Sequence, residues 1–175
     1  MRIGLAVLRA LMGGLFVGHG TQKLFGWFGG HGPDATGQAF EGMGLRPGKA
    51  NALAAGAAEA GGGALLALGL FTPLAGAALT GAMTTAIATV HAPRGPWVTE
   101  GGWEYNAVLI AAVAAIVDVG PGALSLDAVR GRERWGTGWA LASVAAGAGG
   151  AAFVLSRRST GEPEPTSDEE AAAAA

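Results

Sequence analysis

Long stretches without a formal charge are the feature that most limits how this chain can fold. Glu59 is the only charged residue between positions 50 and 93, and none occurs at positions 105–117 or 135–156. A helix that crosses the hydrocarbon core of a bilayer needs about 20 mostly apolar residues. Charged residues make up 14% of the chain, against about 25% in an ordinary soluble domain. The pattern predicts an all-α, polytopic membrane protein.

The apolar stretches predict five membrane-spanning helices, at residues 3–20, 50–70, 74–91, 104–119 and 135–155. Phe71-Thr72-Pro73 is a helix break, because proline cannot continue the hydrogen-bond ladder, so the second and third spans form a hairpin. The alternative is a soluble alanine-rich helical protein, which requires a polar face on most helices. The third span offers only threonines for such a face.

We divide the chain into three parts on this basis. Residues 1–130 form a four-helix transmembrane bundle, and residues 131–156 contain an additional transmembrane helix. Residues 157–175 form an acidic tail, which lacks the apolar side chains needed for a core and is expected to be disordered. Arg9 interrupts the first apolar run, and no clear small-x-small cleavage site follows. We therefore expect the first helix to be retained.

The charge balance and the cysteine content exclude several functions. Eleven Lys and Arg against 13 Asp and Glu give a net charge of −2, so no overall basic field attracts nucleic acid. The chain has no cysteine, which removes thiol chemistry and Cys-ligated metal clusters by the chain itself. The partner that the composition predicts is the lipid bilayer.

The positions of the cations bear on orientation. With five spans, the plain count of Lys and Arg is four on the N-terminal face and six on the other, but long loops count less. Arg130, Arg132 and Arg134 crowd a short loop on the N-terminal face. We therefore expect the N-terminus to be cytoplasmic.

Ionisable side chains inside the spans are the candidate site, because each one costs at least about 2.5 kcal/mol at membrane depth. By the rise of about 1.5 Å per residue, Arg9, Glu59 and Asp118 lie deepest, and we expect Arg9 to pair with the two acids. The remaining candidates lie near the opposite face. The predicted intramembrane polar site comprises Arg9, His19, Lys23, Glu59, His91 and Glu104.

Two interpretations of this set remain open. It is a functional polar site, or a structural one in which pairing of Arg9 locks the bundle and His91 and Glu104 cap spans near water. No spacing such as His-x-x-x-His supports a metal site or a bis-histidine haem. No cofactor motif appears in the chain.

An ordered set of motifs resembles the DoxX family of small bacterial membrane proteins. The resemblance covers roughly positions 5–127 and implies a four-helix membrane bundle in the bacterial inner membrane. It also points to Asp127, which with Asp118 we treat as a structural polar residue. The matching motifs are Leu8-Arg9-Ala10-Leu11, His19-Gly20-Thr21-Gln22-Lys23-Leu24-Phe25-Gly26, Glu59-Ala60-Gly61-Gly62-Gly63, Gly69-Leu70-Phe71-Thr72-Pro73, Gly101-Gly102-Trp103-Glu104-Tyr105 and Gly120-Pro121-Gly122-Ala123-Leu124-Ser125-Leu126-Asp127.

The resemblance suggests functions linked to sulfur and thiol redox, because members of the family include a subunit of a thiosulfate:quinone oxidoreductase and a membrane partner of thiol-detoxifying enzymes. The first hypothesis is therefore a non-catalytic membrane subunit of a redox complex, with protein partners and access to quinone. The second is a small transporter or permease, and the third is a plain assembly protein. A homo-oligomer is compatible with each.

Overall fold

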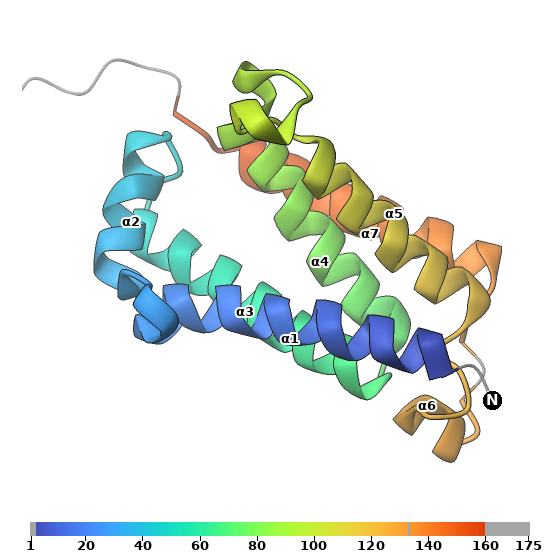
Figure 1. Cartoon of the computed structure of the whole chain (residues 1–175). Coiled ribbons are helices and arrows are strands. Elements are labelled where there is room, and N and C mark those ends of the chain that lie inside the picture. Colours follow the sequence, from blue (N-terminus) through green and yellow to red (C-terminus); the bar gives the residue numbers. More distant parts are fainter. Residues whose placement is uncertain (1–2, 133, 160–175) are drawn as a thin grey trace, which may run out of the picture.

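The computed structural model describes residues 3–132 and 134–159, which are helical with short connecting loops (Figure 1). Five long helices match the five predicted spans in order. Short helices in the connections were not predicted. The helices are α1 (Ile3–Phe25), η1 (Trp27–Gly29), α2 (Gly32–Gly42), α3 (Gly48–Leu68), α4 (Thr72–Ala86), η2 (Ile87–His91), η3 (Ala92–Arg94), η4 (Val98–Glu100), α5 (Glu104–Val119), α6 (Leu126–Val129) and α7 (Thr137–Ser156).

The distribution of side chains is inverted relative to a soluble protein. Along α1, Ile3, Val7, Leu11 and Leu15 follow one outward stripe and are each at least half exposed, whereas Arg9 on the inner face is 2% exposed. Exposed apolar side chains would be unfavourable in water but are favourable against lipid. Polar side chains in a bilayer must instead find partners inside the protein. The chain is therefore a membrane protein with an all-α bundle.

Within the described residues, three helical segments are long and apolar enough to cross a bilayer: Ile3–Phe25, Thr72–Arg94 and Thr137–Ser156. The last of them is the additional helix expected near the C-terminus. Helix α3 has the length but not the hydropathy, because its glycines, Lys49 and Glu59 lower the average. Helix α5 has 16 residues, which is short for a full crossing. The proposed domain boundaries stay a prediction.

Small residues bring the helices into close contact. A Cβ atom added to Gly20 of α1 would lie 2.6 Å from the Cβ of Ala60 in α3, and one added to Gly13 would lie 2.7 Å from the Cβ of Ala67. The same relation joins α7 to α4, where a Cβ at Gly147 would lie 2.7 Å from that of Thr80. Close backbone approach of this kind is the usual basis of helix association in lipid.

The break between α3 and α4 is as predicted. Gly69 ends α3 with φ +59° and Phe71 precedes α4 with φ +47°, so two left-handed residues reverse the chain ahead of Pro73. Beyond this turn the bundle opens. Helices α1 and α3 diverge from α4, α5 and α7 toward the end that carries α2 (Figure 1).

The end of α7 returns to the face of the bundle that carries α2. Arg158 donates from Nε to the carbonyl of Met43 at 2.6 Å, and the Ser159 amide donates to the carbonyl of Gly44 at 2.9 Å. The predicted disorder of the tail from residue 157 therefore does not hold for residues 157–159. The rest of the predicted tail lies outside the described residues.

Candidate functional site

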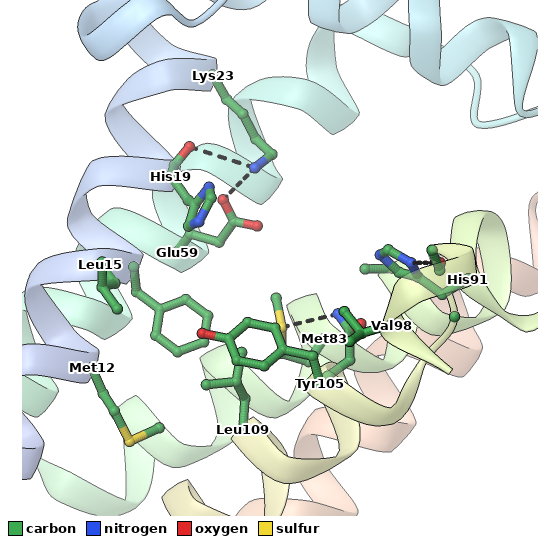
Figure 2. Close-up of a pocket in the computed structure, with 15 residues that line it drawn as sticks. Met12, Leu15, His19, Lys23, Glu59, Met83, His91, Val98, Tyr105 and Leu109 are labelled. Atoms are coloured by element: carbon green, nitrogen blue, oxygen red, sulfur yellow. Dashed lines mark hydrogen bonds and ion pairs between the residues drawn. The ribbon is translucent and has the colours of Figure 1, made fainter. Parts of the chain in front are cut away.

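A cavity of about 300 Å³ lies where the two halves of the bundle diverge (Figure 2). Most of its wall is apolar, including Met12, Phe16 and Leu109. The loop between α4 and α5 contributes Val98 and two glycines to one end. The polar side chains of the wall come from α1, α3, η2 and α5: His19, Lys23, Glu59, His91, Tyr105 and Asn106.

The cavity is open on the side between α1 and α5. Leu15 of α1 and Tyr105 of α5 both line it and are 50% and 52% exposed. These helices pack on α3 and α4 and separate from each other toward the α2 end (Figure 1). The opening therefore lies between two helices of the bundle, at its α2 end (Figure 1).

Lys23 and Glu59 form the ion pair of the cavity. Their Nζ and Oε2 atoms are 2.5 Å apart, and the side chain of Glu59 is only 8% exposed. Side chains tilt toward the N-terminus of their own helix, and α1 and α3 are antiparallel, so these two tilt toward each other from different depths. The expected pairing of Glu59 with Arg9 is therefore wrong. The prediction compared the depths of the two residues along their helices and did not take the direction of their side chains into account.

Arg9 turns instead toward the N-terminal face, where its Nη2 donates to the carbonyl of Leu124 at 2.6 Å. Its Nε and Nη1 atoms are buried and have no hydrogen-bond partner within the described part of the chain. Asp118 is not its partner, since its Oδ1 accepts from the hydroxyl of Thr137 at 2.9 Å. Arg9 therefore lies outside the cavity.

Asp127 holds the turn between α3 and α4. Its Oδ1 accepts the amide of Phe71 at 3.0 Å, and its Oδ2 accepts both the amide of Thr72, at 3.0 Å, and its hydroxyl, at 2.9 Å. A carboxylate at the start of α4 satisfies amides that have no partner within the helix. The motif residues Gly69–Pro73 and Gly120–Asp127 thus meet in one structural unit.

The two histidines of the cavity are each held through Nδ1. His91 binds the carbonyl of Gly101 at 2.7 Å, and His19 binds Oε1 of Gln22 at 3.1 Å. His91 ends the π-helix η2, a rare local geometry that is frequent at functional sites. The regular period of α4 therefore ends before His91.

The structure adds residues that sequence reasoning missed on α5. Glu104 does not line the cavity, because its Oε1 accepts the amide of Val98 at 2.6 Å and fastens the loop. Its neighbours Tyr105 and Asn106 line the cavity instead. Asn106 is 7% exposed and donates from Nδ2 to Sδ of Met83 at 3.4 Å. Asn106 could have been found from the sequence, because an amide inside an apolar span is costly to bury unless it has a hydrogen-bond partner.

No three His, Cys, Asp or Glu side chains are grouped as metal ligands within residues 3–132 and 134–159. What the site offers is an ion pair, two imidazoles, a phenol and an amide on an apolar wall. Such a cavity can bind a small molecule that is mostly apolar and has a few polar atoms.

The fold and the cavity define a polytopic α-helical membrane protein with a polar site inside its bundle. The sequence model of the DoxX family matches residues 4–92, about half of the chain. The chain belongs to the DoxX family, as the motifs indicated. No curated protein and no solved structure gave a match.

Proposed function

We propose that this chain is a bacterial inner-membrane protein, with its N-terminus in the cytoplasm, that serves as a non-catalytic subunit of a redox complex and binds a quinone. The observation that carries the proposal is the cavity between α1 and α5, which has a mostly apolar wall and polar groups from four helical segments on it. A quinone reaches its sites from the lipid phase and needs a few hydrogen-bonding groups around its ring.

The size and lining of the cavity fit this ligand. Small-molecule sites start at about 300 Å³ and are mostly apolar with a few placed polar groups, and the cavity has that volume. Because the chain has no cysteine, electrons for a bound quinone would come from a partner protein. This requirement favours a subunit over a self-sufficient enzyme.

A cavity-filling substitution tests the proposal. We expect Leu109→Trp to abolish binding of a decyl-substituted benzoquinone to the purified protein in nanodiscs, measured by calorimetry, because Leu109 lines the cavity. Val108→Trp is the matched control, since the adjacent side chain is 62% exposed and lies outside the cavity. Equal binding by the two variants, or no binding to the unmodified protein, would refute the proposal.

A small transporter is the second candidate, and the Lys23–Glu59 pair favours it. Opposite charges on a cavity wall can separate and each bind an ion, as in membrane transport sites. Flux of a charged solute into proteoliposomes, lost in Glu59→Gln, would support the transporter over the quinone subunit.

A further inference from the structure

The protonation of the two imidazoles follows from their hydrogen bonds. A backbone carbonyl only accepts, so Nδ1 of His91 must donate to Gly101. The amide of Gln22 is oriented by its Nε2, which donates to the carbonyl of Phe28 at 3.3 Å, so its Oε1 faces His19. Nδ1 of His19 therefore donates as well. In the neutral form, both rings leave Nε2 as an acceptor.

Other groups on the wall also accept. Oε2 of Glu59 is taken by Lys23, and among the described residues no donor binds its Oε1. Asn106 donates one N–H of its Nδ2 to Met83, and its carbonyl oxygen stays free to accept. Lys23 directs its ammonium group at Glu59 and, at 3.5 Å, at the carbonyl of His19. The remaining donors on this wall are the hydroxyl of Tyr105, the second N–H of Asn106 and the third N–H of Lys23.

The numbers of free hydrogen-bond acceptors and donors on the cavity wall determine which ligand can pair with them. Acceptors outnumber free donors, so a ligand that brings only carbonyl oxygens and excludes water from the wall would leave most of the acceptors unpaired, which is costly. Lys23 already neutralises Glu59, so the wall has no excess negative charge to attract a cation. Because most of the wall is apolar, the ligand is lipophilic.

We infer that the cavity selects a neutral, lipophilic ligand with hydroxyl donors, and that it therefore binds the reduced hydroquinone in preference to the quinone. His19 and His91 are the selecting acceptors, from opposite sides of the cavity (Figure 2). This inference rests on the proposed function and deepens it by naming the redox form that the site takes.

Four probes with the same decyl chain test the selection on the full chain in nanodiscs: the benzoquinol, its dimethyl ether, the benzoquinone and a decylamine. Calorimetry under anaerobic conditions should show that the quinol binds about tenfold more tightly than its ether or the quinone, since two hydrogen bonds are gained and each contributes a factor of roughly two to ten. The ether keeps the ring and loses only the donors.

A histidine variant assigns the preference to a residue. His19→Phe should reduce the ratio of quinol to ether affinity severalfold, and it is expected to fold because His19 is exposed within the cavity opening. His31→Phe is the control, since His31 lies at the start of α2, outside the cavity, and should leave the ratio unchanged.

The outcomes separate the two proposals. Equal or tighter binding of the quinone overturns the selection by donors and leaves the quinone site standing. Tighter binding of the amine overturns the selection and indicates a cation site. Absence of binding by all four probes overturns both the selection and the proposed function.

Discussion

The direction of a side chain, more than the height of its Cα atom, decides which charges meet in this bundle. Lys23 and Glu59 lie on antiparallel helices and tilt toward each other. Arg9 tilts toward the N-terminal face and reaches Leu124. The sequence predicted that these cations and acids needed partners, and four of the six predicted site residues line one cavity. Predicting which partners they bind would have required the direction of each side chain and the arrangement of the helices.

The buried ion pair gives a prediction at this scale. Lys23→Met should lower the free energy of unfolding by about 3 kcal/mol, because Glu59 would remain buried without a counter-charge. Glu59→Gln in the Lys23→Met background should recover part of the loss. Lys49→Met is the control, because its pair with Asp34 is exposed and should cost less than about 1 kcal/mol. Equal losses in Lys23→Met and Lys49→Met, measured by denaturant titration in detergent, would argue against a buried pair.

Asp127 gives a second prediction. Asp127→Ala removes the acceptors of three hydrogen bonds at the start of α4 and should destabilise the protein by about 3 kcal/mol. Asp118→Ala removes one exposed hydrogen bond and should cost less than about 1 kcal/mol. Thermal unfolding in the same detergent measures both. A larger effect for Asp118→Ala would contradict the structural role of Asp127.

At the scale of elements, hydropathy and helix breakers predicted the long helices. The short helices and the local geometry of the loops depend on packing. The predicted span 104–119 coincides with α5, and the others differ from the helices by a few residues at most ends. Helix α2 was missed because its sequence is polar and rich in glycine, with no apolar period. The π-helix at Ile87–His91 leaves no composition signal, so the position of His91 in the cavity could not be derived from a regular helix.

Two glycines of α1 test the contact between helices. Gly20→Ala should lower stability by about 2 kcal/mol, because its Cβ would overlap Ala60 of α3. Gly18→Ala should be neutral or stabilising by up to about 1 kcal/mol, since nothing lies within 4 Å of its Cβ and alanine favours the helix. If both substitutions shift the unfolding midpoint in the same direction by a similar amount, α1 and α3 do not pack as described.

At the scale of the whole molecule, Arg158 and Ser159 contact the α2–α3 loop. The start of α1 and the end of α7 therefore lie at opposite ends of the bundle (Figure 1). An odd number of crossings is therefore expected, although α5 is short. Charge counts in the loops predicted a direction only weakly, because the cations are divided nearly evenly between the faces.

Reporters at the two ends test this topology. A fusion ahead of Met1 should report the cytoplasm, and a fusion after Ser159 should report the other side of the membrane. Both signals in the cytoplasm would mean that the chain crosses an even number of times and that α7 or α5 does not span.

The central claim is that the cavity between α1 and α5 receives a lipophilic ligand, and photolabelling tests it most directly. A photoreactive decyl quinone should label the full chain in nanodiscs at cavity residues such as Leu15 and Tyr105, and excess unlabelled ligand should suppress the labelling. Mass spectrometry of the peptides locates the sites. Labelling spread over lipid-facing residues such as Leu141 and Phe153 of α7, without suppression by excess ligand, would contradict the claim.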